Sequence, residues 1–190
     1  MKILIVRPWP SVLDVTKNTY NIQEVGLAKA LVKRGHPTDI LFWTDGDEMT
    51  VKVEVEGAKP INVFYRHGKV LLKNVWFGGQ EKLFAQYDVL QTAEYNQMFS
   101  WHLAGKYPEK TVVYHGPYYS PFNKNYNRMC RVFDALFVGR YRRCGTRFLT
   151  KSELARKFLL EKRLSPEQVT TVGVGIDAEL LRDRPDAGQT

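Results

Sequence analysis

The chain has 190 residues, a formal net charge of +8 and 44% hydrophobic residues, which is typical of a globular protein of one large domain. No apolar run approaches the ~20 residues that span a bilayer, and the N-terminal run is too short for a signal peptide. Cys130 and Cys144 form neither a disulfide framework nor a metal-ligand spacing. We therefore expect a cytoplasmic protein with two free thiols and no metal site.

The positive charge is concentrated in one part of the sequence. Residues 101–163 contain 14 Lys or Arg against 4 Asp or Glu, whereas residues 1–100 contain 12 against 11. A basic surface attracts anionic ligands or anionic surfaces. The segment is compatible with solvated helix faces, with phosphate contact, or with a peripheral position on the inner face of an anionic membrane. Nucleic acid is not expected as a partner, because the sequence contains no recognition motif for it.

Apolar runs and periodicities predict strands that alternate with helices. Strands are expected at residues 2–7, 39–43, 51–55, 61–65, 69–72, 88–92, 111–114, 147–149 and 169–172. Helices are expected at residues 21–34, just before residue 86, at 95–105, at 125–142, and from 152 to about 163. Ser152 is a natural N-cap for the last of these helices.

This alternation predicts an α/β fold, with a doubly wound, mostly parallel Rossmann-like sheet that carries helices on both faces. A small antiparallel hairpin region is expected near residues 51–72. Within it, residues 61–65 and 69–72 look like a hairpin that turns at His67-Gly68.

Two groups of polar residues are candidates for ligand binding because of their positions. The ligands of such sheets bind outside the carboxyl ends of the strands, and the N-terminus of a helix attracts anions. The first group lies in the loop before the first helix and the second follows the strand at 88–92: Asn18, Thr19 and Tyr20, then Glu94, Tyr95 and Asn96. The alternative for either group is simple capping of the following helix.

A histidine follows the strand at 111–114. A group at this position can act as a base or as a hydrogen-bond partner for a sugar hydroxyl or phosphate, so we take His115 as the candidate catalytic residue. Gly116 would let a ligand approach the backbone, and Tyr118 offers an aromatic face for stacking. The alternative is a histidine with a purely structural hydrogen bond.

Taken together, four pieces of the sequence resemble the N-terminal domain of a GT-B-fold glycosyltransferase of family four (group one). The pieces are residues 1–6 (MKILIV), 26–36 (GLAKALVKRGH), 114–116 (YHG), and 150–155 (TKSELA) with 172–177 (VGVGID). Their order and spacing fit across nearly the whole chain. The glycine pair that is usual in the first loop of the family is absent here.

The resemblance implies a retaining enzyme that transfers a sugar from a nucleotide-sugar donor to a saccharide or lipid-linked acceptor, as in cell-surface polysaccharide or glycolipid synthesis. Residues 1–180 would form the acceptor-side domain, residues 181–190 a linker or tail, and a C-terminal donor domain would be absent from the chain. Residues 18–20 would meet the diphosphate, and His115 would orient or polarise sugar groups. A UDP- or GDP-sugar is the expected co-substrate, with no further cofactor. The alternative is a stand-alone, non-catalytic Rossmann-like ligand-binding module.

Overall fold

The computed structural model describes residues 1–17, 22–71 and 73–175. In chain order, the strands are β1 (Ile3–Val6), β2 (Thr38–Trp43), β3 (Met49–Val53), β4 (Ile61–Arg66), β5 (Lys69–Leu71), β6 (Asn74–Trp76), β7 (Val89–Ala93), β8 (Thr111–His115), β9 (Arg147–Thr150) and β10 (Val169–Thr171). The helices are α1 (Gln23–Lys33), α2 (Glu81–Phe84), α3 (Met98–Lys106), α4 (Lys124–Leu136), α5 (Val138–Arg143) and α6 (Glu153–Leu160), with a short 3-10 helix η1 (Pro166–Gln168) before β10.

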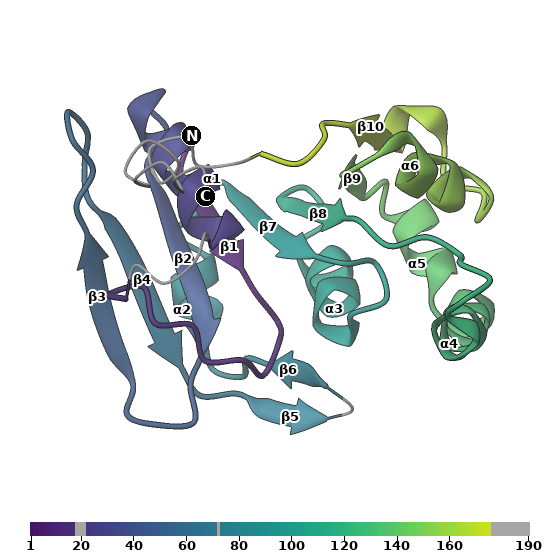
Figure 1. Ribbon diagram of the computed structural model, residues 1–190, viewed down its shortest axis with the longest axis horizontal. Coiled ribbons are helices and arrows are strands. Elements are labelled where there is room, and N and C mark those ends of the chain that lie inside the picture. The colour runs from purple at the N-terminus through teal and green to yellow at the C-terminus, as the bar shows by residue number, and fades with distance from the viewer. Residues whose placement is uncertain (18–21, 72, 176–190) are drawn as a thin grey trace, which may run out of the picture.

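Eight strands form one sheet in the order β10-β9-β8-β7-β1-β2-β4-β3. Every neighbouring pair is parallel except β3 with β4, which is antiparallel and places β3 at one edge. The strands run across the molecule from β3 to β10, and α4, α5 and α6 gather at the β10 end (Figure 1). The predicted α/β fold with a mostly parallel sheet is therefore confirmed.

The central strand β1 shows why the sheet needs helices on both faces. All four of its side chains are buried, which is the pattern of a parallel strand covered on both sides. Ile3 and Ile5 pack in a core cluster with Ala28 of α1, whereas Leu4 packs in the opposite cluster with Phe99 of α3. Alternate side chains of a strand point to opposite faces, so one short apolar run anchors both layers.

The predicted hairpin between residues 61–65 and 69–72 is wrong. β4 pairs with β3 and β2 instead, and β5 pairs with β6 in a separate two-stranded antiparallel sheet. The alternation in β4, with Ile61, Val63 and Tyr65 buried, comes from its position inside the large sheet. β5 is exposed along its whole length and lies outside the large sheet.

Two predicted helices have different bounds in the structure. The helix expected at residues 125–142 is divided into α4 and α5 at Phe137, whose carbonyl accepts a hydrogen bond from Trp101 Nε1 at 3.0 Å. The helix expected at 95–105 begins at Met98, because the residues before it form a turn. Ser152 caps α6 as expected, accepting from the backbone N–H of Ala155 at 3.1 Å.

Candidate active site

The order of the strands reverses between β1 and β7, and we call the region outside the carboxyl ends of these strands the crevice. β2 and β4, which follow β1 in the chain, lie on one side of β1. β7, β8, β9 and β10, which come later, lie on its other side. Ligands of open α/β sheets bind at such a reversal, outside the carboxyl ends of the strands. The residues that follow β1, β7, β8 and β9 therefore define the candidate site.

Glu94 follows β7 and is the centre of this group. Its side chain is 8% exposed, and its carboxylate oxygen Oε2 accepts from His115 Nδ1 at 2.6 Å and from the backbone N–H of Gly116 at 3.2 Å. The other oxygen, Oε1, lies 3.6 Å from Lys151 Nζ. Three neighbours from two further strands thus fix one carboxylate at the carboxyl edge of the sheet.

The backbone of Glu94 is also unusual. Its φ angle is +59°, in the left-handed region that residues with a side chain rarely adopt, at a cost of about 1–3 kcal/mol. The backbone N–H of Glu94 donates to the carbonyl of Tyr114 at 3.0 Å, which holds this conformation. Strain of this kind is concentrated at functional sites, and here it positions the carboxylate toward His115.

His115 is the last residue of β8 and lies behind Glu94. Its side chain is fully buried, stacked on Phe158 at 5.5 Å between ring centroids and in edge contact with Tyr95 at 5.1 Å. Its Nε2 has no hydrogen-bond partner among the described residues. Because its side chain is fully buried and its Nδ1 contacts Glu94, His115 offers no atom to a ligand at the surface in this structure.

Lys151 was not among the predicted site residues. It directly follows β9, and the neighbouring strand β8 ends at His115. Its side chain is 28% exposed, and Nζ lies 4.9 Å from the ring centroid of Tyr114. An ideal Cβ at Gly116 would lie 2.6 Å from Cδ of Lys151. Gly116, which we expected to let a ligand approach the backbone, instead leaves room for the aliphatic part of the Lys151 side chain.

Arg7 adds a second cation at the crevice, because it directly follows β1. Its guanidinium forms an ion pair with Glu24 in the first turn of α1 at 2.6 Å.

The Tyr114 hydroxyl lies at the same edge. Burial raises its pKa, with smaller contributions from the charges of Glu94 and Glu24. The Tyr114 hydroxyl donates to the carbonyl of Gly173 at 2.8 Å, which ties the segment after β10 to the same edge.

The remaining predicted residues have different positions. Asn18, Thr19 and Tyr20 lie outside the described residues. Tyr95 is fully buried, where its hydroxyl donates to Asp134 at 3.1 Å, so it offers no surface to a ligand in this structure.

Asn96 is half-buried and Tyr118 is 43% exposed. Neither Glu94 nor Asn96 caps α3, since Asn74 accepts from the first backbone N–H of that helix at 2.8 Å.

An apolar cavity of about 930 Å³ adjoins this edge, formed largely by the β5–β6 hairpin. Its lining is His67, Gly68, Lys69, Leu71, Asn74, Trp76, Gly78 and Met98. Two hydrogen bonds fix the hairpin to this edge. One runs from Val75 N–H to the carbonyl of Pro8 after β1, and the other from the N–H of Met98, the first residue of α3, to Asn74. Leu71 is 72% exposed and Trp76 is 37% exposed, so apolar surface is available to a ligand beside the crevice. Sequence reasoning missed this cavity, because its wall depends on the pairing of β5 with β6.

A parallel sheet with charged side chains at its carboxyl edge, beside an apolar cavity, is the arrangement at which α/β domains bind their ligands. Residues 25–180 match the sequence model of Glycosyltransferase Family 4. The chain belongs to this family and is a glycosyltransferase domain. No individual curated protein matches the chain.

Within residues 1–17, 22–71 and 73–175, no helix is both long and apolar enough to cross a membrane. In the same ranges, no group of three or more His, Cys, Asp or Glu side chains comes together in the manner of metal ligands. Cys130 and Cys144 are free thiols.

Proposed function

We propose that the crevice at Glu94 is the acceptor-side wall of a site that transfers a sugar from a UDP- or GDP-sugar to a lipid-linked or saccharide acceptor. The observation that carries the proposal is the buried carboxylate of Glu94, held by His115, Gly116 and Lys151 at the reversal of strand order. A fixed carboxylate accepts hydrogen bonds from sugar hydroxyls. Retention of the anomeric configuration is proposed from the family resemblance alone.

The charges at the crevice suit the chemistry of a nucleotide-sugar donor. In the transfer, the bond between the anomeric carbon and the diphosphate oxygen breaks, and the acceptor hydroxyl forms the new bond and gives up its proton. Negative charge then develops on the leaving diphosphate, and positioned cations stabilise it. Lys151 and Arg7 are the cations at this edge. We propose that they face the diphosphate, together with the loop at residues 18–20.

The apolar cavity favours an acceptor with an apolar part. Leu71 and Trp76 present exposed apolar surface, and Met98 lies four residues after Glu94. Ligand sites combine apolar walls with a few fixed polar groups, and the cavity and Glu94 together have this composition. We propose that the lipid portion of a lipid-linked acceptor lies on the hairpin, with its sugar end toward Glu94.

The test is a transfer screen of the full-length enzyme against UDP- and GDP-sugars with saccharide and polyprenyl-linked acceptors. The proposal predicts transfer by the full-length enzyme and none by residues 1–190 alone, because the donor must be held against the acceptor by a facing nucleotide-sugar-binding domain. Turnover by residues 1–190 alone would overturn the need for that domain. Donor binding by the full-length protein without any transfer would favour the non-catalytic binding module.

A further inference from the structure

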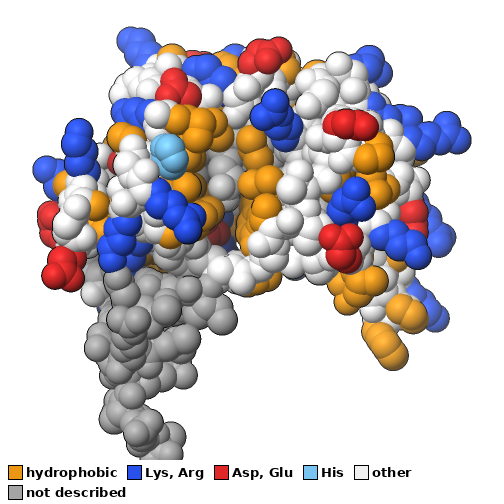
Figure 2. Space-filling model, turned by 90° about the horizontal axis from the view of Figure 1, so that it is seen from above, with side chains coloured by type: hydrophobic (Ala, Val, Ile, Leu, Met, Phe, Trp, Pro, Cys, Tyr) orange, Lys and Arg blue, Asp and Glu red, His pale blue; other side chains and the backbone are white. Residues whose placement is uncertain are grey.

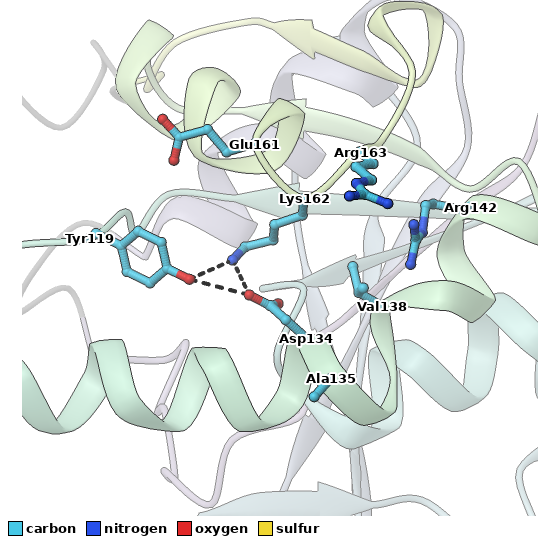
Figure 3. A pocket seen from close by; sticks show the side chains of 8 residues that line it. All are labelled: Tyr119, Asp134, Ala135, Val138, Arg142, Glu161, Lys162 and Arg163. Carbon is cyan, nitrogen blue, oxygen red and sulfur yellow. Dashed lines mark hydrogen bonds and ion pairs between the residues drawn. The ribbon is translucent and has the colours of Figure 1, made fainter.

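A second cavity, of about 470 Å³, opens where α4, α5 and the end of α6 come together (Figure 3). It shares no residue with the Glu94 group or with the apolar cavity at the β5–β6 hairpin. Its lining includes Tyr119, Asp134, Val138, Arg142, Lys162 and Arg163. The proposed transfer reaction makes no use of this cavity.

The floor of the cavity is an ion pair whose charges balance each other. The Lys162 side chain is 4% exposed, and its ammonium donates to Asp134 and, at 3.1 Å, to the Tyr119 hydroxyl. The Tyr119 hydroxyl donates to Asp134 at 3.2 Å, and the Tyr95 hydroxyl donates to the other carboxylate oxygen of Asp134 at 3.1 Å. Asp134 is therefore held by these three groups and does not neutralise the cations at the rim.

Two arginines at the rim have no acidic partner of this kind. Arg142 of α5 and Arg163 after α6 are exposed, and no ion pair with either is found in the described part of the chain. Figure 3 shows both guanidinium groups on the Val138 side of the cavity, whereas the carboxylate of Glu161 points away from them. Two like charges that line one cavity without a counter-charge create a positive potential that attracts an anion.

The backbone of Arg163 is strained. Its φ angle is +61°, in the left-handed region that a residue with a side chain adopts at a cost. Helices commonly end with a glycine in this conformation, and here an arginine takes that place just after α6. Strain of this kind is concentrated at ligand-binding sites, which indicates that the guanidinium of Arg163 is used.

The surroundings of the cavity strengthen its attraction for anions. Residues 124–163 contain 12 Lys or Arg against 3 Asp or Glu. Figure 2 shows Lys and Arg side chains that project from the end of the molecule that carries α4 to α6. Such a surface raises the local concentration of anions, and the two rim arginines provide a place where one can be bound.

We propose that this cavity binds the phosphate group of a soluble, phosphorylated small molecule. A guanidinium presents its N–H groups in a planar fork that matches phosphate oxygens, and a phosphate monoester has enough oxygens and charge for the forks of both Arg142 and Arg163. The cavity has the size of a small-molecule site and exceeds what a phosphate ion alone would fill. Ala135, Val138 and the ring of Tyr119 line the rest, so the phosphate is expected to carry an organic group.

The test is an NMR titration of the chain that follows the backbone amide signals of Ala135, Val138 and Arg163. The ligands are phenyl phosphate, inorganic phosphate and benzoate. Phenyl phosphate should shift the three signals at the lowest concentration, and inorganic phosphate should need a higher one. Benzoate should bind about tenfold more weakly, because a carboxylate has less charge and fewer acceptor oxygens than a phosphate. The amides of Gly116 and Lys151 report separately on any binding at the crevice.

A pair of substitutions at the rim has a matched control on the same helix. Arg142→Gln with Arg163→Gln should weaken the binding of phenyl phosphate at least about tenfold, because hydrogen bonds between charged groups are lost. Arg143→Gln with Arg147→Gln removes the same charge from two exposed neighbours that do not line the cavity. This control should bind phenyl phosphate nearly as tightly as the wild type does.

Arg163→Gly separates ligand contact from damage to the fold. Glycine adopts a positive φ without strain, so this variant should unfold at a higher urea concentration than the wild type. It should nevertheless bind phenyl phosphate more weakly, because the guanidinium is gone. Weaker binding by a more stable protein cannot come from a loss of structure.

Three results would overturn the proposal. The first is that the three cavity amides do not respond to phenyl phosphate, and the second is an equal weakening in the matched control. The third is binding to vesicles that contain phosphatidic acid, dependent on Arg142 and Arg163, without any response to phenyl phosphate, which would make a lipid headgroup the source of the phosphate. No nucleotide sugar or acceptor is present in these assays, so their outcome is separate from that of the glycosyl-transfer screen.

Discussion

The Nδ1 atom of His115 lies 2.6 Å from Oε2 of Glu94, and both side chains are buried where two neighbouring parallel strands end. The histidine fixes the carboxylate from behind, while Lys151 approaches it from the crevice. A sugar at the crevice would contact Glu94 and Lys151 directly. His115 would affect the sugar only by holding Glu94 in position.

His115→Ala in the full-length enzyme should lower kcat by about 10²-fold, because Glu94 loses its shortest hydrogen bond and with it a fixed position. It should also lower the free energy of unfolding by about 1–3 kcal/mol, the cost of a buried group left unsatisfied. His115→Asn can still donate to the carboxylate and should recover part of kcat. Steady-state kinetics and urea unfolding of both variants are the measurements. Equal rates for the Ala and Asn variants would show that His115 does not act by positioning Glu94.

Gly116→Ala should reduce transfer by displacing Lys151, since its Cβ would lie 2.6 Å from the lysine Cδ. Lys151→Met should reduce kcat through loss of the cation at the leaving diphosphate. If the two changes act through the same ammonium, their effects will not add in the double variant. Fully additive losses in a double-mutant cycle would mean that Gly116 serves some purpose other than seating Lys151.

Leu71→Ser should raise KM for a lipid-linked acceptor by about tenfold, which is the scale of one leucine side chain removed from water, and leave kcat close to the wild-type value. Val70→Ser is the matched control, because Val70 is exposed on the same strand but does not line the cavity. Acceptor titrations at saturating donor give both constants. If Leu71→Ser, Val70→Ser and the wild type all have the same KM, the cavity is not part of the acceptor site.

Stability should depend on pH through His102, whose ring lies 4.5 Å from that of Trp76 between centroids. Burial, and then the charges of Lys106 and Arg140, lower the pKa of His102 below 6.5, with Glu81 acting weakly in the opposite direction. As pH falls below about 6.5, the unfolded chain binds a proton that the folded chain does not, so stability falls. His102→Gln should therefore lose less stability than the wild type when urea unfolding is repeated at about pH 7.5 and about pH 5.5. An equal loss in both proteins would contradict this pKa shift.

Much of the fold could be predicted from local patterns. The apolar run of β1 and the periodicity of α1 identified a parallel sheet covered by helices. The partners of β4 could not be predicted, because alternation along a strand reports burial and not which strand lies beside it. The division of α4 from α5 was also not predicted; in the structure, the carbonyl of Phe137 at the break accepts a hydrogen bond from Trp101 of α3, a residue distant in the sequence.

The candidate site was predicted in part. Polar residues that follow strands face the crevice, which predicts Glu94 and His115, and the structure brings these two together. The same reasoning applied to Lys151, but the many basic residues around it made it look like part of a charged surface. The burial of His115 behind Phe158 depends on packing from α6 and could not be read from neighbouring residues.

The most direct test of the central claim is the transfer rate of Glu94→Gln in the full-length enzyme. Glutamine keeps the size of the side chain but removes the charge that holds His115 and Lys151. If the crevice is the glycosyl-transfer site, kcat/KM should fall at least about a hundredfold while the circular dichroism spectrum stays as in the wild type. A folded Glu94→Gln enzyme with near-wild-type kcat/KM would contradict the assignment of the site.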